Sequence, residues 1–134
     1  MLDWRSVDST KLEPEFRSDV DGLFSSLTYA YDVLEGYRSL ERSAALYAAY
    51  LKGGPKAAPP GKSAHNYGLA VDFALRRDPP LPNLGVWDWT GTSSGWKAAL
   101  AAIEAHPRLH SGVGFGDTDH VEKLNWKSYR SWAA

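Results

Sequence analysis

Residues 63 to 72 read Ser63-Ala64-His65-Asn66-Tyr67-Gly68-Leu69-Ala70-Val71-Asp72, and they place a histidine seven positions before a carboxylate. From Leu69 onward apolar residues alternate with small or polar ones, which predicts a strand whose Asp72 points away from the apolar face. Gly68 can adopt a positive φ, so it can turn His65 back over the strand toward Asp72. A histidine and an aspartate placed in this way are two metal ligands that require a third.

The third ligand is expected in residues 114 to 122, which read Gly-Phe-Gly-Asp-Thr-Asp-His-Val-Glu, and His120 is the candidate. His106 and His110 have no patterned partner, so they are interpreted as surface or core histidines rather than ligands. The chain contains no cysteine, and any zinc site must therefore use nitrogen and oxygen ligands. The sequence thus offers His65, Asp72 and His120 as one metal-binding set.

The two blocks together, Ser-x-His-x-x-Gly-x-Ala-x-Asp and an acidic residue three positions before a histidine, resemble a family of zinc peptidases. The family includes D-alanyl-D-alanine carboxypeptidases and dipeptidases, and the L-alanyl-D-glutamate endopeptidases of phage endolysins. A third block, Glu35-Gly36-Tyr37-Arg38-Ser39, resembles the family's Gly-Tyr-Arg-Ser segment, so the resemblance covers residues 35 to 122 in order. It implies an α+β fold of the Hedgehog or DD-peptidase type, with a small, mainly antiparallel sheet flanked by helices and a single catalytic zinc at the sheet.

Zinc in hydrolases typically has three protein ligands and an open position for water, and the set named above supplies that number. Asp117, three residues before His120, is placed to act as the general base and then to protonate the leaving amine. The family's acidic residue at this spacing has that role; many members have glutamate there, and the aspartate resembles the phage endopeptidase branch. Asp119 is the alternative base, because Gly116-Asp117 is itself a turn-forming pair.

Three further polar residues have expected roles. Arg38 follows a predicted strand and should hydrogen-bond the substrate carbonyl oxygen and the oxyanion that replaces it, as the family implies; the alternative is a residue that only caps a surface helix. Ser63 should donate a hydrogen bond to the substrate or to a group beside the metal, because no local residue could activate it as a nucleophile. Glu122 is interpreted as a buried residue that supports the fold or the ligands rather than as a base.

The composition limits the remaining possibilities. With 134 residues the chain has the size of one domain, and no separate cell-wall-binding domain is visible. The formal net charge is -1 with both signs interspersed, which offers no basic surface to nucleic acid. No apolar run is long enough to span a membrane and no export signal is visible, so the expectation is a monomer made in the (host) cytoplasm that acts on the bacterial cell wall. The six Trp and seven Tyr either pack the core or line a groove for an extended or sugar-bearing ligand.

Hydrophobic spacing and turn residues predict the other elements. The expected order is a helix over residues 12–28, a strand near 29–33, a helix over 40–51 capped by Ser39, a loop over 53–62, the strand from 69, an ordered excursion over 76–91, a helix from Ser93 or Ser94 to near Pro107, a strand over 109–115 and a short helix over 125–132.

The resemblance implies zinc-dependent hydrolysis of a peptide bond in the peptidoglycan stem peptide. The first choice is an L-alanyl-D-glutamate endopeptidase of the endolysin type, because of Asp117, the short chain and the missing signal peptide. The alternatives are a D-alanyl-D-alanine carboxypeptidase or dipeptidase, and a zinc-containing module that binds wall peptides without hydrolysing them. Asp117 and Arg38 argue against the module, since a purely structural zinc site needs neither.

Overall fold

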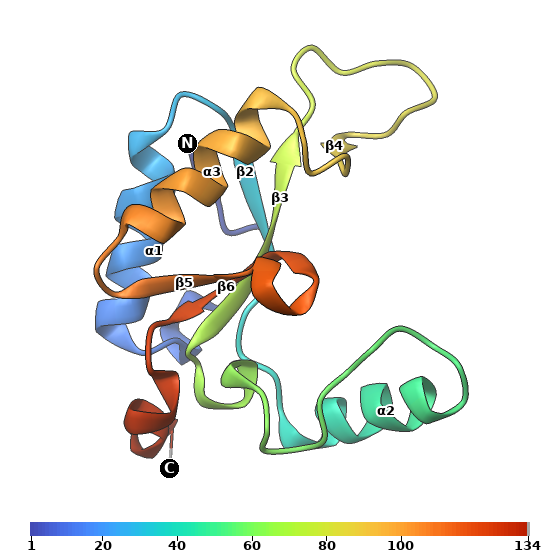
Figure 1. The fold of residues 1–134 in the computed structure, drawn as a ribbon, viewed down its shortest axis with the longest axis vertical. Helices are drawn as coiled ribbons and strands as arrows, with labels where there is room; N and C mark the ends of the chain where they lie inside the picture. Colours follow the sequence, from blue (N-terminus) through green and yellow to red (C-terminus); the bar gives the residue numbers. More distant parts are fainter. Residues whose placement is uncertain (134) are drawn as a thin grey trace.

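A single sheet lies at the centre of the computed structural model, which describes residues 1–133 (Figure 1). Within this range the sheet has six strands, in the spatial order β1 (Leu2–Asp3), β2 (Tyr31–Glu35), β3 (Ala70–Arg76), β6 (Asp117–Lys123) and β5 (Leu109–Gly112), with β4 (Trp87–Asp88) paired to the far end of β3. β1 and β2 run parallel, and the other neighbouring pairs in the described chain are antiparallel. The mainly antiparallel α+β fold expected from the sequence is confirmed.

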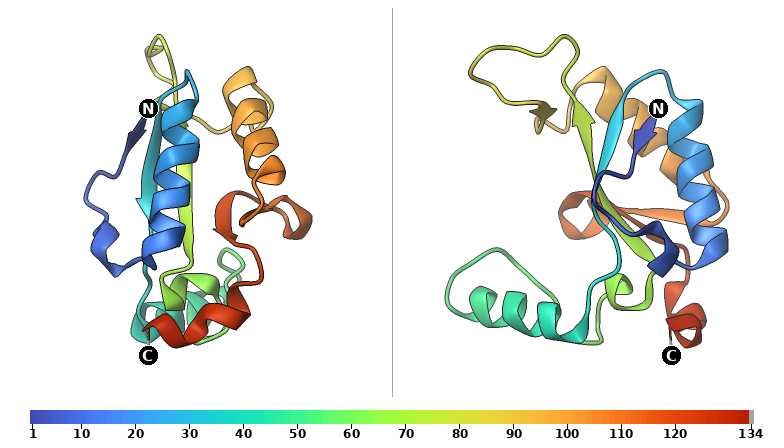
Figure 2. Two further views of the ribbon diagram at one scale, coloured as in Figure 1. Left: turned by 90° about the vertical axis from the view of Figure 1, so that its left-hand side faces the viewer. Right: turned by 180° about the vertical axis from the view of Figure 1, so that it is seen from behind.

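Two of the helices, α1 (Pro14–Ser26) and α3 (Ser94–Ala105), lie together on one side of the sheet (Figure 2). Glu13 caps α1 by accepting hydrogen bonds from the backbone N–H groups of Glu15 and Phe16. None of the helices found in residues 1–133 is long and apolar enough to cross a membrane. The other helical elements are α2 (Leu40–Leu51) and the 3₁₀ turns η1 (Ser9–Lys11), η2 (Ala64–Tyr67), η3 (Val113–Phe115) and η4 (Trp126–Ala133).

The hydrophobic core lies between the sheet and these two helices. Phe73 of β3 is at its centre, with ring centroids 4.8 Å from Phe24 and 5.2 Å from Trp96. Because successive side chains of a strand point to opposite faces, Asp72 points away from this core. The buried helix side chains recur every three or four residues, as expected for helices with one apolar face: Phe16, Val20, Leu23 and Phe24 in α1, and Trp96, Ala99 and Ile103 in α3.

The boundaries of three elements differ from the sequence prediction. The strand expected over residues 109–115 ends at Gly112, and the chain continues as η3. The ladder between β5 and β6 shifts register between Ser111 and Gly112. The backbone of Asp117 and the Cβ of His120 approach Gly112 so closely that a side chain there would collide with both. The first helix is shorter than residues 12–28, because the cap is Glu13, and the second strand begins at Tyr31 rather than near residue 29.

α2 has the predicted bounds but does not pack on the core. Ser39 is its N-cap and accepts a hydrogen bond from the backbone N–H of Arg42 at 3.0 Å, as predicted. Within this fully described helix only Ser43 is buried, and Leu40 and Leu51 are exposed. The helix projects away from α1 and α3 (Figure 1), and its Tyr47 and Tyr50 are not part of the hydrophobic core cluster.

Candidate functional site

The centre of the site is a row of three side chains that crosses the middle of the sheet. Glu35 of β2 pairs with Asp72 of β3, and Asp72 pairs with His120 of β6. Residues directly opposite each other in neighbouring strands share a face, so the row lies on the face opposite α1 and α3. A β-bulge between Val33 and Glu35 is needed for this arrangement, because in a regular strand Leu34 would pair with Asp72.

His65 reaches the row from η2, the turn that precedes β3. The Ser63 hydroxyl caps this turn by accepting a hydrogen bond from the His65 backbone N–H at 3.2 Å, and Gly68 ends it with a φ of 67°. A side chain at position 68 would be strained at this φ and would collide with the backbone of Lys11. Gly68 therefore turns the chain back toward Asp72, as the sequence predicts.

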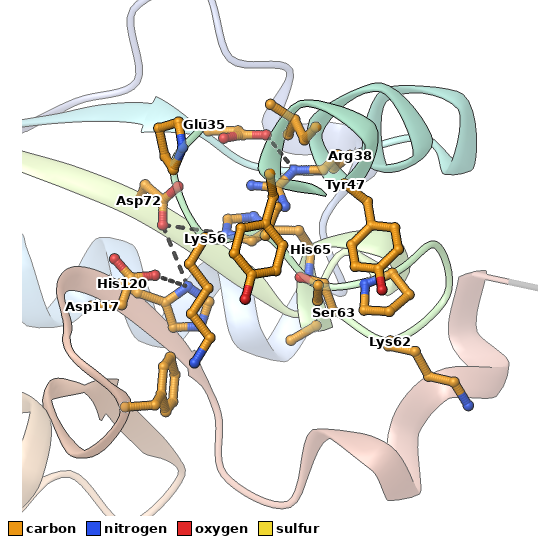
Figure 3. Close-up of a pocket in the computed structure, with 18 of the residues that line it drawn as sticks. Glu35, Arg38, Tyr47, Lys56, Lys62, Ser63, His65, Asp72, Asp117 and His120 are labelled. Carbon is orange, nitrogen blue, oxygen red and sulfur yellow. Dashed lines mark hydrogen bonds and ion pairs between the residues drawn. The ribbon is translucent and has the colours of Figure 1, made fainter. Parts of the chain in front are cut away.

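Three ligand atoms converge where η2 meets the row (Figure 3). Nε2 of His65 lies 3.2 Å, and Nδ1 of His120 lies 3.4 Å, from Oδ1 of Asp72, and the three atoms all lie within 4.8 Å of one another. Zinc with tetrahedral bonds of about 2.0–2.2 Å holds neighbouring ligand atoms roughly 3.3 Å apart. The separations fit zinc, and the three residues predicted as one metal-binding set are brought together.

In each of the two histidines, the outer nitrogen, the ring nitrogen that faces away from Asp72, is within hydrogen-bonding distance of an oxygen. Nδ1 of His65 lies 2.8 Å from the carbonyl oxygen of Gly36, and Nε2 of His120 lies 2.8 Å from a carboxylate oxygen of Glu122. These oxygens accept hydrogen bonds, so the outer nitrogens carry the protons and the inner ones of neutral rings present lone pairs to Asp72. Lone pairs that face a carboxylate at this distance require a cation between them, either a proton or a metal ion.

The charges around Asp72 shift two pKa values in opposite directions. Burial alone would raise the pKa of Asp72, but its hydrogen bonds with His120 and His65 outweigh burial and hold this pKa well below the usual range. Burial would lower the pKa of His120, but its hydrogen bonds with Asp72 and Glu122 raise this pKa to about 9. At neutral pH the metal-free protein therefore carries a proton on His120 that a bound metal ion must displace.

Two more carboxylates, both from β6, border the ligand cluster. An oxygen of Asp117 lies 3.8 Å from Nδ1 of His120, and the Asp117 side chain is 48% exposed. Burial, followed by the contact with Asp117 and the charge of Asp72, raises the pKa of Asp119 to about 7. Both residues considered as the general base thus lie at the site, and Asp117 combines closeness to a ligand histidine with access to solvent.

Arg38 extends into the same pocket from the segment between β2 and α2. Its Nε donates a hydrogen bond to Glu35 at 2.6 Å, and its side chain is 11% exposed. Burial would lower the pKa of the guanidinium, but the hydrogen bond with Glu35 and the charges of Asp72 and Asp117 raise it. Arg38 is therefore a permanently charged donor held near the ligand cluster and does not cap α2, a role that Ser39 has.

Asn66 is a site residue that the sequence pattern does not reveal. Its side-chain amide donates to the Arg38 carbonyl at 3.0 Å and to the Ser43 hydroxyl at 2.7 Å, and its side-chain oxygen accepts from the backbone N–H groups of Gly61 and Ser63. These bonds join the turn that carries His65 to Arg38 and to α2. The only sequence signal is its position next to His65, because its partners are distant in sequence or are backbone groups.

The site residues line a pocket of about 1010 Å³ (Figure 3). One wall is formed by α2 and the following loop, including Tyr47, Lys56 and Lys62, and other lining residues are Phe115 and Trp126. This volume is at the upper end of the range of about 300–1,000 Å³ for small-molecule pockets. The pocket therefore has room for an extended ligand.

No protein-family model matches the chain. Among solved structures, the L-Ala D-Glu endopeptidase ChiX of Serratia marcescens aligns with a TM-score of 0.60 and 18% identity over 94% of this chain and 87% of that one. The LdcB LD-carboxypeptidase aligns with a TM-score of 0.62 and 18% identity over 97% of this chain and 70% of that one. The chain has the fold of these peptidases.

A third structure with this fold is the vancomycin resistance D,D-dipeptidase VanXYg, solved with a D-Ala-D-Ala phosphinate analogue. It aligns with a TM-score of 0.59 and 18% identity over 90% of this chain but only 54% of its own length. The shared fold accounts for the sheet and the helices. The chemistry of this chain has to be argued from its own pocket, because identities this low establish the fold alone.

We expect His65→Ala and His120→Ala to lose most of their bound zinc, because each substitution removes one of the three candidate ligands. His106→Ala and His110→Ala are the matched controls and should keep zinc at wild-type stoichiometry, since neither residue belongs to the ligand cluster. Elemental analysis of the purified variants measures the metal content. Full zinc content in both ligand variants would show that the site is assigned wrongly.

Zinc binding at pH 7 should release about one proton, because His120 has a pKa of about 9 without metal and must be neutral to coordinate. The apparent zinc affinity should therefore weaken as the pH falls below about 9. Titration calorimetry in two buffers of different ionisation enthalpy counts the released protons. A count of zero at pH 7 would contradict the role of His120 as a ligand.

Proposed function

We propose that the chain is a zinc peptidase that hydrolyses a peptide bond in the stem peptide of bacterial peptidoglycan. The observation that carries this proposal is the convergence of His65, Asp72 and His120 in one pocket with Asp117 and Arg38. Two histidines and one carboxylate form the type of three-ligand set that catalytic zinc sites use, with one position left open. The fold shared with three peptidases supports the same class of reaction.

Zinc bound by this set would supply a Lewis acid that polarises the substrate carbonyl and lowers the pKa of the attacking water from about 15.7 to roughly 7. Asp117 would accept the proton of this water and then donate it to the leaving amine. One of its carboxylate oxygens lies 3.8 Å from Nδ1 of His120, so Asp117 borders the proposed ligand atoms. Gly36 and Glu122 would keep the two imidazoles in the orientation that coordination requires.

Arg38 would bind the carbonyl oxygen of the scissile bond and stabilise the negative charge that develops on it. A guanidinium suits this role because it is always charged and presents several donors in a fixed plane. Ser63 also lines the pocket, and we propose that its hydroxyl donates to the substrate while its oxygen accepts from the His65 amide.

Among the bonds of the stem peptide we propose the L-alanyl-D-glutamate bond. The pocket of about 1010 Å³ is larger than a free dipeptide needs, so it favours an endopeptidase with substrate residues on both sides of the cleaved bond. The aspartate at position 117, in place of the glutamate of many related peptidases, supports the same choice. We further propose that the chain acts on the cell wall as a monomer, in the manner of an endolysin.

A D-alanyl-D-alanine carboxypeptidase is the second candidate, because a D,D-dipeptidase and an LD-carboxypeptidase share the fold with similar TM-scores. Mass spectrometry of the products from purified peptidoglycan distinguishes the candidates. New N-terminal glutamate would support the endopeptidase, and released D-alanine would support the carboxypeptidase. A zinc-loaded chain that binds peptidoglycan and releases no product would instead support a binding module.

A further inference from the structure

Glu35 takes no part in the chemistry proposed above, yet it makes a short contact with Arg38, which does take part. Its Oε1 accepts a hydrogen bond from Nε of Arg38 at 2.6 Å, a charge-assisted bond between two ionised groups. The Glu35 side chain is 31% exposed and that of Arg38 only 11%, so water screens this pair less than it screens a surface ion pair.

The backbone of β2 is irregular at the position that brings Glu35 to the site. Val33 pairs with Phe73, and the next pair along β3 is Glu35 with Asp72, so Leu34 is left out of the ladder. In a regular strand Leu34 would occupy the site face, where its apolar side chain could not hold a guanidinium. Bulges often re-aim a side chain beside a functional site, and here the re-aimed side chain is Glu35.

The hydrogen bond at Nε determines which N–H donors of the Arg38 guanidinium remain available to a ligand. A guanidinium has five N–H donors, one on Nε and four on the two terminal nitrogens. Within residues 1–133, Glu35 is the one side chain that pairs with this head group, and it takes the Nε donor. The terminal nitrogens are therefore free for a ligand in the pocket that Arg38 lines (Figure 3).

Arg38 also lies in the field of two other carboxylates, Asp72 and Asp117. Without a fixed partner the guanidinium would be attracted to either of them. A contact with Asp72 would compete with the metal, and a contact with Asp117 would compete with proton transfer. A third carboxylate that holds Arg38 at Nε removes this competition.

We propose that Glu35 is a positioning residue for Arg38. Glu35 holds the guanidinium at Nε, so that the two terminal nitrogens of Arg38 face the carbonyl oxygen of the scissile bond. The inference rests on the proposed function, because Glu35 acts on the reaction only through Arg38. Its role is to keep one donor geometry ready before the substrate arrives.

Glu35→Ala should lower kcat by about ten- to a hundredfold, the range typical of residues that orient a group in a metal site, with a smaller change in KM. Glu35→Gln keeps an oxygen acceptor at the same distance and should recover part of this loss. Glu41→Gln is the matched control, because Glu41 is an exposed acidic residue of α2 outside the pocket. Zinc content should stay at the wild-type level in all three variants.

A double-mutant cycle distinguishes positioning from a direct role. In an Arg38→Ala background, Glu35→Ala should cause no further loss of kcat, because no guanidinium remains to be held. An equal loss in both backgrounds would show that Glu35 acts on the substrate or the metal itself, and the inference would be wrong. Wild-type kcat in Glu35→Ala would overturn it as well.

A measurement without turnover separates this inference from the proposed function. The ¹⁵N NMR signal of the Arg38 Nε–H should be protected from exchange in the wild type and in Glu41→Gln, and should lose this protection in Glu35→Ala. A rapidly exchanging Nε–H in the wild type would contradict the inference whatever the activity. A protected Nε–H in a zinc-loaded chain that hydrolyses no peptidoglycan would leave the Glu35 contact in place and remove the proposed function.

Discussion

Asp117→Asn should reduce the hydrolysis of peptidoglycan by about a hundred- to ten-thousandfold, the range over which general acid–base groups typically contribute. Asparagine keeps the size and much of the hydrogen-bonding shape of aspartate, but it cannot accept the proton of the attacking water. The Asp117 side chain is 48% exposed, so the substitution removes no core contact, and zinc content and thermal stability should remain at wild-type levels. The rate of release of soluble wall fragments measures the effect.

Asp119→Asn is the matched control for this prediction, because Asp119 lies two residues away in the same pocket. We expect a much smaller loss of activity, since Asp117 is the carboxylate that approaches His120. Full activity in Asp117→Asn together with an inactive Asp119→Asn would show that the base is misassigned by two residues. Equal losses in both variants would indicate that the two carboxylates share the proton as a coupled pair.

Arg38→Lys should lower kcat by about ten- to a thousandfold while zinc stays bound, because the arginine acts mainly on the charge of the transition state. Lysine keeps the positive charge but has one ammonium group in place of the fork. It cannot bond Glu35 and the substrate with separate nitrogens, as the guanidinium can. Steady-state kinetics on a stem-peptide substrate should show kcat falling more than KM rises.

Arg17→Lys provides the control for this substitution, since Arg17 is an exposed residue of α1 and lines neither the pocket nor the ligand cluster. It should leave kcat unchanged. Wild-type turnover in Arg38→Lys would remove Arg38 from the mechanism and, with it, the positioning role of Glu35.

Local sequence patterns predict much of this fold because the elements that build it are marked by local chemistry. Ser39 as a cap and the apolar spacing of α1 and α3 appear in the structure as expected. The failures come from tertiary contacts. The strand expected over residues 109–115 ends at Gly112, where the ladder to β6 shifts register and Gly112 lies against Asp117 and His120 of that strand. α2 has the predicted bounds, but the sequence does not indicate that this helix forms a wall of the pocket.

The convergence of His65, Asp72 and His120 could be predicted because two short motifs fix both the type and the spacing of these residues. The residues around them could not. Asn66 makes four side-chain hydrogen bonds, and two of the partners are 23 and 28 positions away in sequence. A local sequence motif cannot indicate contacts over such separations. Glu35 and Arg38, which form an ion pair, are only three residues apart in sequence. However, the pairing of Glu35 with Asp72 depends on a bulge that the sequence of β2 does not mark.

The metal dependence of wall hydrolysis tests the central claim most directly. Purified chain is stripped of metal, and the release of fragments from peptidoglycan is followed as zinc is added back in steps. We expect hydrolysis to be absent without zinc, to rise in proportion to zinc and to reach its full rate at one equivalent, with His120→Ala inactive at the same zinc concentration. Metal-free chain that hydrolyses peptidoglycan at the full rate, or His120→Ala with wild-type activity, would contradict the account.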